Sequence, residues 1–359
     1  MFSYTSGVTT MRRFPMLLII SAVAAAVLLP SLGAASEEQE RCSFWIDLYS
    51  GEPARYEEIL EDLKLARVIY LGERHTLVRH HDIQEQIITD LAARGVQLAI
   101  GLEMLPAVVQ ATADKYNVGQ LSFDDLAEEV AWEGLWNNYE QYRGAIEAGR
   151  EAGAPILALN AESDLVTEVA RKGFAGLDPG QAAQLPAQIN TDQPDYQREL
   201  SRVMMVMAHV TGDTDMLSRM FEAQVTRDET MAEGIARFLK SPAGEGRTVV
   251  VLCGSGHVSY GYGIPSRVRA RVPDVTDRIV ILSESGDVVL SEREKAMARA
   301  IEVTHAQLRE NSVPIADYLH AKALAPEAGV SEPEGSEASA PDPDTSGSGS
   351  ETPMGQDTQ

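Results

Sequence analysis

Cysteine is nearly missing from this chain, because its 359 residues include only two, Cys42 and Cys253. A small scaffold held together by several disulfides is therefore excluded, and the fold must rest on a hydrophobic core. A single bridge between the two cysteines stays open. A buried free thiol at Cys253 stays open as well, because this residue ends an apolar segment.

Glycine-rich phosphate loops are missing too. No Gly-x-Gly-x-x-Gly motif opens a predicted helix and no Walker-type loop occurs, so nucleotide binding has no support in the sequence. Basic residues are scarce, with 30 Lys and Arg against 54 Asp and Glu and a formal net charge of -24. This charge argues against nucleic acid and anionic membrane surfaces as partners.

The N-terminus has the pattern of a secretory signal peptide, which we assign to residues 1–35. Arg12 and Arg13 precede an uncharged run over residues 14–32, and small residues follow that run. We therefore predict export to the periplasm or cell envelope. An uncleaved membrane anchor is the alternative, because the run is just long enough to cross a bilayer. Cys42 lacks the short apolar and small residues of a lipoprotein signal before it, so we expect no lipid anchor.

The C-terminal segment is poor in residues that build a core. From residue 323 onward there is no Lys, Arg, Ile or aromatic residue, and Ser, Gly, Pro, Ala, Glu and Asp dominate. Such a composition cannot bury enough apolar surface to offset the entropy of ordering. We predict a disordered acidic tail over residues 323–359.

Between these ends, residues 42–322 have the pattern of one α/β domain. Short continuous apolar runs, typical of strands buried on both faces, occupy residues 66–71, 97–102, 155–159, 248–252 and 277–282. Helical patterns separate them, which predicts a mostly parallel central sheet flanked by helices. A long helical stretch at about 181–240 exceeds a simple crossover and predicts a helical cap or subdomain.

Polar residues follow four of the predicted strands where these strands end. They are Glu73 and His75, Glu103, Asn160, and His257. Because an open parallel sheet binds ligands at the carboxyl ends of its strands, we expect these side chains in one pocket. The turn that holds His75 would alone be explained by helix capping, but a second glycine-histidine turn at His257 favours a binding site. His75, Glu103 and His257 could hold zinc, manganese, iron or cobalt, since imidazole and carboxylate suit all four metals.

In their order along the chain, these motifs resemble the ChaN-like haem-binding family, which belongs to a superfamily with Tiki, TraB and erythromycin esterase proteins. The similarity covers about residues 66–268, and its segments are 68–75 with His81, 101–104, 142–143, 154–160, 171–173, 224–232 and 256–268. The resemblance implies an exported or lipid-anchored, iron-regulated protein that binds haem and helps to acquire it. Arg227 departs from the family's pattern, which tends to have an aromatic residue there.

The resemblance makes haem the expected cofactor. A haem receptor or transporter and a second copy of the chain are the expected partners. Haem needs an apolar slot and an axial His, Tyr, Met or Cys ligand. The candidate cofactor-binding residues are His75, Glu103, Tyr139, Tyr142, Asn160, His257 and Tyr260, with Tyr262 as a further axial candidate. The spacing of Trp132, Trp136, Tyr139 and Tyr142 predicts that they share one face of a helix beginning at Ser122.

A metal-dependent hydrolase, either a peptidase or an esterase, is the alternative function for the same residues. In that case Glu73 is the general base beside the metal or water, and Arg143 steadies a developing oxyanion. A non-catalytic interaction protein is a third hypothesis. We favour haem binding, because the resemblance to the haem-binding family extends along more of the chain.

Overall fold

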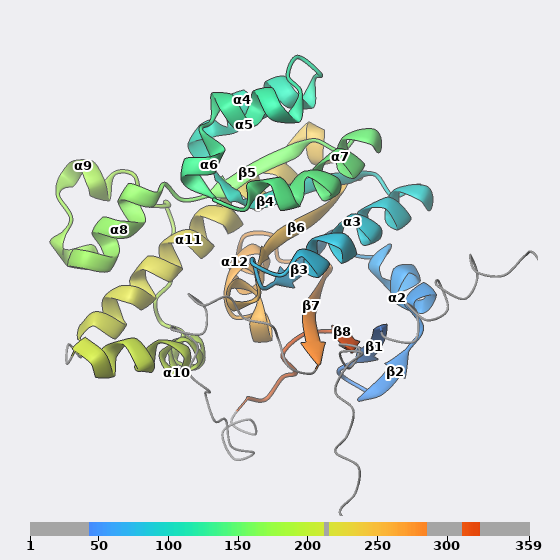
Figure 1. The fold of residues 1–359 in the computed structure, drawn as a ribbon. Coiled ribbons are helices and arrows are strands. Elements are labelled where there is room, and N and C mark those ends of the chain that lie inside the picture. Colours follow the sequence, from blue (N-terminus) through green and yellow to red (C-terminus); the bar gives the residue numbers. More distant parts are fainter. Residues whose placement is uncertain (1–42, 212–214, 286–310, 324–359) are drawn as a thin grey trace, which may run out of the picture. The chain divides into compact units, whose positions relative to one another are not determined.

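The computed structural model describes residues 43–211, 215–285 and 311–323 (Figure 1). The predictions for the signal peptide, for Cys42 and for the tail beyond Ala323 lie outside these residues. Cys253 is buried and has no disulfide partner among the residues that are described. Within the same ranges, no helix has the length and apolar character needed to cross a membrane.

The described strands form an eight-stranded sheet in the order β2-β1-β8-β7-β3-β6-β4-β5. The five predicted strands are β3 (Val68–Glu73), β4 (Leu98–Pro106), β5 (Ile156–Asn160), β6 (Thr248–Gly254) and β7 (Asp277–Ser285). Every pairing among these five is parallel. The predicted α/β fold with a mostly parallel sheet is therefore confirmed.

Three strands were not predicted, namely β1 (Ser43–Asp47), β2 (Glu52–Ala54) and β8 (Tyr318–Ala323). Strand β8 pairs in parallel with β7, whereas β1 pairs antiparallel with both β8 and β2. These strands are short and mix polar with apolar residues, as in the YLHAKA segment of β8. They therefore lack the continuous apolar run by which the central strands were recognised.

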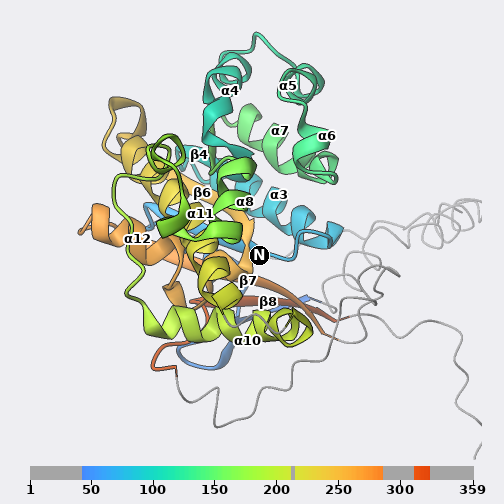
Figure 2. The ribbon, with the colours of Figure 1, turned by 90° about the vertical axis from the view of Figure 1, so that its left-hand side faces the viewer.

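Successive side chains of the central strands enter two cores on opposite faces of the sheet. Val250 and Leu252 of β6 join the core formed with α2 (Tyr56–Leu63), α3 (Val78–Ala93) and α7 (Arg143–Glu151). Val249 and Val251 join the core formed with α11 (Asp215–Leu239) and α12 (Ile264–Arg271). Figure 2 shows α3 on one side of the strands and α12 on the other. Burial on both faces explains why β6 has no polar residue between Val249 and Leu252.

The predicted helical stretch corresponds to α9 (Pro179–Ala182), α10 (Pro194–Thr211) and α11. Before it come α8 (Ser163–Lys172) and a 3-10 turn, η3 (Phe174–Gly176). The stretch is not set apart from the sheet, because Met231, Ala232 and Ile235 of α11 lie in the second core. Tyr196 and Leu200 of α10 pack against Phe221 and Val225 of α11.

The aromatic segment after Ser122 is not one helix, so the prediction of a shared helical face is wrong. A capping box between Ser122 and Asp125 starts α5 (Phe123–Glu129), but Ala131 has a left-handed backbone with φ 51° that ends the helical path. The aromatics are then divided between α6 (Trp132–Leu135) and η2 (Tyr139–Tyr142). Trp132 and Tyr139 consequently stack on each other, whereas Trp136 contacts His75 and Tyr142 contacts Glu73.

The sheet ends at β5, whose outer edge is covered by two carboxamides of α4 (Gln110–Asn117), a helix preceded by η1 (Ala107–Val109). Asn117 Oδ1 accepts from the Ile156 N–H at 2.8 Å and Gln110 Oε1 accepts from the Ala158 N–H at 2.7 Å. Both side-chain amides also donate to the Ile156 carbonyl, at 3.1 and 3.2 Å. A carboxamide has the same donor and acceptor groups as a peptide, so these side chains take the place of a further strand.

Candidate functional site

Parallel strands bring the predicted polar residues to one edge of the sheet. Glu73 ends β3, Glu103 lies near the end of β4, and His257 lies in a 3-10 turn, η5 (Ser255–His257), directly after β6. His75 follows β3 and reaches toward β6. The structure therefore brings these four side chains into one row, in the order Glu73, His75, Glu103, His257.

Glu73 is a fully buried carboxylate held by four side chains. Its Oε1 lies 2.8 Å from His75 Nδ1 and accepts a short hydrogen bond from the Tyr142 hydroxyl. Its Oε2 lies 3.2 Å from His81 Nδ1 and accepts from Gln84 Nε2 at 2.5 Å. Burial alone would raise the pKa of Glu73, but hydrogen bonds from His75 and His81 outweigh it and lower the pKa to about 2.

Glu103 and His257 form the centre of the row. Glu103 Oε1 lies 3.2 Å from His257 Nε2 and 3.9 Å from His75 Nε2, while its Oε2 accepts from the Gly254 N–H at 2.7 Å. Burial would raise the pKa of Glu103, but the neighbouring His257 and His75 and the Gly254 N–H lower it to about 2.

His257 is held on its other side by Asp228, which was not predicted as a site residue. Asp228 Oδ1 lies 2.6 Å from His257 Nδ1, and Asp228 Oδ2 accepts from the Tyr196 hydroxyl at 2.7 Å. Gln224, one helical turn before Asp228, lies 2.9 Å from the same ring nitrogen. Both residues fall in the family-like segment 224–232, and two polar residues four apart on the buried side of α11 were the available signal.

His257 is an imidazolium ion in this arrangement, because both of its ring nitrogens face carboxylates. Burial opposes the charge, but Glu103 and Asp228 outweigh it and raise the pKa of His257 to about 10. The row thus alternates carboxylate and imidazole groups from Glu73 to Asp228, so each of its carboxylates lies beside an imidazole.

The ligand-free protein should be most stable between about pH 4.5 and 6.5, the ordinary pKa values of Glu and His. The lowered pKa of Glu103 stabilises the fold above pH 4.5, and this contribution is lost as the pH falls through about 2. The raised pKa of His257 stabilises it below pH 6.5, and this contribution is lost as the pH rises through about 10. Urea unfolding at pH 6, 8 and 10 measures the alkaline loss. In His257→Gln the free energy of unfolding should fall less between pH 6 and pH 10. An equally large fall in the variant would contradict the assignment.

Gly254 is required where β6 meets His75. A Cβ at Gly254 would lie 2.7 Å from His75 Nε2 and 3.0 Å from His75 Cε1, closer than such atoms approach. The His75 ring therefore packs against the backbone of β6. Glycine is needed at this position for the close approach of the ring and not for its backbone conformation, since other residues also adopt its φ of -61°.

One aromatic residue lies on the exposed side of the row. Trp136 meets the His75 ring edge to face, with centroids 4.9 Å apart. The His75 side chain is 33% exposed, compared with 8% for His257 and 2% for His81. His75 is therefore the imidazole of this group that faces solvent.

The other predicted residues lie apart from an open ligand position. Tyr142 is fully buried against Glu73, and Asn160 donates from its side chain to the Glu103 carbonyl at 2.9 Å. Tyr139 stacks on Trp132 at 5.6 Å and lines a separate cavity of about 330 Å³ with acidic walls.

Tyr260 lies in η6 (Ser259–Gly261), where it stacks on Tyr262 at 5.5 Å, and its N–H donates to the Ile315 carbonyl. The Arg143 guanidinium pairs with Asp124 and with Glu140, the latter at 3.0 Å, so these acidic groups already neutralise it.

A bare metal finds no ready set of ligands in the described ranges, where no three His, Cys, Asp or Glu side chains are grouped to hold one. The reason is visible in the row. His257 meets a carboxylate at each ring nitrogen, and His75 Nδ1 is bound to Glu73. His75, Glu103 and His257 are close together, but they face one another and do not surround a common position for a metal ion.

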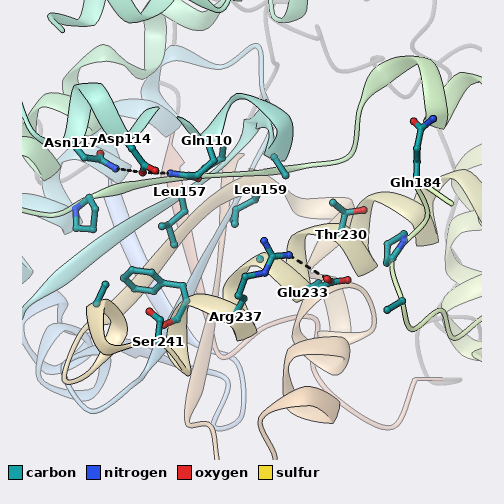
Figure 3. Close-up of a pocket in the computed structure, with 18 of the residues that line it drawn as sticks. Gln110, Asp114, Asn117, Leu157, Leu159, Gln184, Thr230, Glu233, Arg237 and Ser241 are labelled. Atoms are coloured by element: carbon teal, nitrogen blue, oxygen red, sulfur yellow. Dashed lines mark hydrogen bonds and ion pairs between the residues drawn. The ribbon is translucent and has the colours of Figure 1, made fainter. Parts of the chain in front are cut away.

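A further cavity of about 790 Å³ lies beside β5, between α4, α11 and residues 183–187 (Figure 3). Its floor includes Leu157 and Leu159, and its rim includes Glu233 and Arg237, which pair at 3.2 Å. No His, Tyr, Met or Cys lines it. The cavity is large enough for a small molecule but offers no ligand to a haem iron.

The fold and the strand-edge row define an α/β protein with a row of histidines and carboxylates at one edge of its sheet. The family model described as "Haem-binding uptake, Tiki superfamily, ChaN" matches residues 59–268, and the chain belongs to this family.

Among solved structures, one of cofacial haem binding to ChaN of Campylobacter jejuni is similar. It is 19% identical, has a TM-score of 0.58, and covers 77% of this chain and 96% of that chain. At this identity the likeness concerns the fold. An erythromycin esterase, EreC, is 13% identical over 67% of this chain and 77% of its own, with a TM-score of 0.40.

A plant protein, RETICULATA-RELATED 5, chloroplastic, of Arabidopsis thaliana, is 24% identical over 257 residues. The match covers 67% of this chain and 34% of the plant protein, so the chain spans about a third of that relative.

Proposed function

We propose that this chain is an exported haem-binding protein of haem uptake, which holds haem at the strand edge with His75 toward the iron. The observation that carries the proposal is the exposure of His75, whose side chain is 33% exposed while its neighbours in the row are buried. A ligand arriving from solvent meets this imidazole first.

The hydrogen bonds of His75 fit a ligand of iron. Its Nδ1 is bound to Glu73 at 2.8 Å, while its Nε2 is 3.9 Å from Glu103, beyond hydrogen-bond distance. In the ligand-free protein this Nε2 faces the Gly254 backbone, so the ring would have to turn away from β6 for Nε2 to reach an iron. Metal-bound histidines commonly donate their second ring N–H to a carboxylate, which fixes the ring and makes the ligating nitrogen more basic. Glu73 would have this role for His75. Bound haem would supply the iron and its ligand-exchange and redox chemistry.

The backbone around His75 is also fixed before any ligand arrives. The His75 carbonyl accepts from Asn138 Nδ2 at 2.5 Å and from His81 Nε2 at 3.1 Å. These bonds join the turn after β3 to α3 and to the segment before η2. A rigid turn lowers the entropy lost when the imidazole binds a ligand.

An indole lies beside His75 and could contact a porphyrin. Trp136 lies against the imidazole, and two residues close to His75 or Trp136 in sequence are exposed and hydrophobic, Val78 at 52% and Leu135 at 41%. Exposed apolar groups beside a polar centre are typical of ligand sites. A haem receptor or transporter would then take up the ligand, and the N-terminal signal pattern supports export.

A haemin titration of the purified protein, followed by absorption in the Soret region, tests this proposal. We expect a red-shifted Soret band that saturates at a defined ratio of haemin to protein. An unrelated acidic protein at the same concentration and in the same buffer is the control for nonspecific adsorption of haemin. A wild-type protein that leaves the haemin spectrum unchanged would overturn the proposal.

The metal-dependent hydrolase has weaker support, because each carboxylate of the row lies beside an imidazole and no metal-binding group is found among the described residues. Metal analysis of the same preparation and a peptidase and esterase screen with added manganese or cobalt address it. Hydrolysis that requires the metal and is lost in Glu73→Gln would favour this alternative over haem binding.

A further inference from the structure

Two arginines stand out because their guanidinium groups form no hydrogen bond or ion pair with the residues that the structure describes. The other arginines of the described ranges pair with a carboxylate, a carbonyl or another group. Arg74 and Arg227 are the exceptions within those ranges. In a chain with 54 acidic residues and 30 basic ones, an arginine without a partner is unusual.

Both arginines adjoin the ends of the histidine–carboxylate row. Arg74 lies between Glu73 and His75 in the turn after β3, where it is exposed. Arg227 immediately precedes Asp228 in α11 and is half-buried. The row runs from Glu73 to Asp228, so an arginine without an ion pair in the described ranges adjoins each of its ends in sequence.

The position of Arg227 on α11 directs it to the border of the site. With about 100° between successive helical residues, Arg227 lies about 60° from Gln224, which contacts His257. Ala223, which directly precedes Gln224, packs with Val166 and Val169 of α8. Arg227 therefore lies between the helix face that meets His257 and the face that meets α8.

The row itself cannot neutralise an anionic ligand. Its carboxylates face its own imidazoles, with Glu103 and Asp228 both bound to His257. A ligand that brings carboxylates to this edge would be repelled by a chain of net charge -24 unless cations stood at the rim. A free guanidinium binds a carboxylate in a bidentate manner and is well suited to this purpose.

We propose that Arg74 and Arg227 are the carboxylate-binding residues of this site and select porphyrins that carry free propionate groups. The inference rests on the proposed function, since it concerns the orientation and choice of the ligand that His75 holds. The site would therefore discriminate between haemin and a porphyrin whose carboxylates have been esterified.

Soret titrations with haemin and with haemin dimethyl ester, at the same ionic strength, test this assignment. Wild type should bind haemin about a hundredfold more tightly than the ester, since two charge-assisted contacts are at stake. Arg74→Gln and Arg227→Gln should each weaken haemin binding about tenfold and leave ester binding unchanged, because each removes one charge-assisted contact. The double variant should bind both porphyrins alike. Arg227→Lys should restore part of the preference.

Arg237→Gln is the matched control, because Arg237 lies on the same helix but pairs with Glu233. It should bind both porphyrins as wild type does. The urea midpoints of Arg74→Gln and Arg227→Gln should equal that of wild type, since neither guanidinium has a hydrogen bond or ion pair to lose among the described residues.

Two failures can be told apart. If wild type gives no Soret shift with either porphyrin, the proposed function fails and this inference falls with it. If wild type binds haemin and its ester equally, or if the glutamine variants keep the wild-type preference, haem binding stands and the arginine assignment is overturned.

Discussion

His75→Ala should lower the affinity for haemin by about a hundredfold or more and should change the spectrum of any haem that remains bound. The iron would lose its protein ligand, while the apolar contacts of the porphyrin with Trp136 would remain. Soret titration measures the affinity, and electron paramagnetic resonance of the ferric complex reports the axial ligand. His75→Gly with added imidazole should regain the wild-type spectrum, which a variant that merely unfolds could not do.

Tyr139→Phe and Tyr260→Phe are the matched controls, because each removes one phenol that could ligate iron and little else. Both tyrosines lie away from the row, Tyr139 against Trp132 and Tyr260 against Tyr262, so both variants should keep the wild-type spectrum. If a tyrosine variant lost haem while His75→Ala kept it, the ligand assignment would be wrong.

Glu73 connects this prediction with the local structure. A glutamine at position 73 can still contact His75 Nδ1 but carries no charge to polarise the ring. We therefore place Glu73 as a residue that positions His75 and not as a ligand of iron. The buried bonds from Tyr142 and Gln84 hold its carboxylate in place, so that its direction is set by three elements of the fold.

The central sheet was predictable because burial on both faces leaves a continuous apolar run, and each run found its strand within a few residues. The same rule explains the meeting of Glu73, Glu103 and the His257 turn, since parallel strands end at one edge. No such rule predicts the contact of Asp228 with His257 from the sequence. It reaches His257 from a helix, and only the packing of α11 on the sheet brings them within 2.6 Å.

The helix after Ser122 shows the opposite limit. Its aromatic spacing favoured one continuous face, yet the left-handed Ala131 separates Trp132 from α5. Trp132 then turns into the core, where its Nε1 donates to the Met104 carbonyl, while Trp136 reaches His75. Tertiary packing determines the conformation of this segment, and the periodicity of the sequence contains no information about that packing.

Glu229→Gln should destabilise the protein by about 3–5 kcal/mol, the usual effect of removing one partner of a buried ion pair. Glu229 lies in α11 beside Asp228 and pairs with Arg267 at 3.1 Å and Arg271 at 2.7 Å, with Glu229 and Arg267 side chains only 1% and 2% exposed. The variant leaves the Arg267 charge buried without its counterion. Urea unfolding at constant pH measures the loss in unfolding free energy. The slope of that free energy against urea concentration should stay unchanged. Glu233→Gln, in the exposed pair with Arg237, should leave the unfolding free energy as it is.

Removing both charges separates the cost of a lone buried ion from the other bonds of Arg267. In Glu229→Met with Arg267→Met the Arg267 charge is removed with its counterion, and only Arg271 is left without its Glu229 partner, so part of the lost stability should return. Recovery should stay incomplete by about 1–3 kcal/mol, because Arg267 also donates to the carbonyls of Asn190, Tyr262 and Gly263, which would lose their donor. Full recovery would mean that these bonds contribute little. Since they tie the loop after His257 to α12, their loss should also loosen the turn that holds His257 against Glu103.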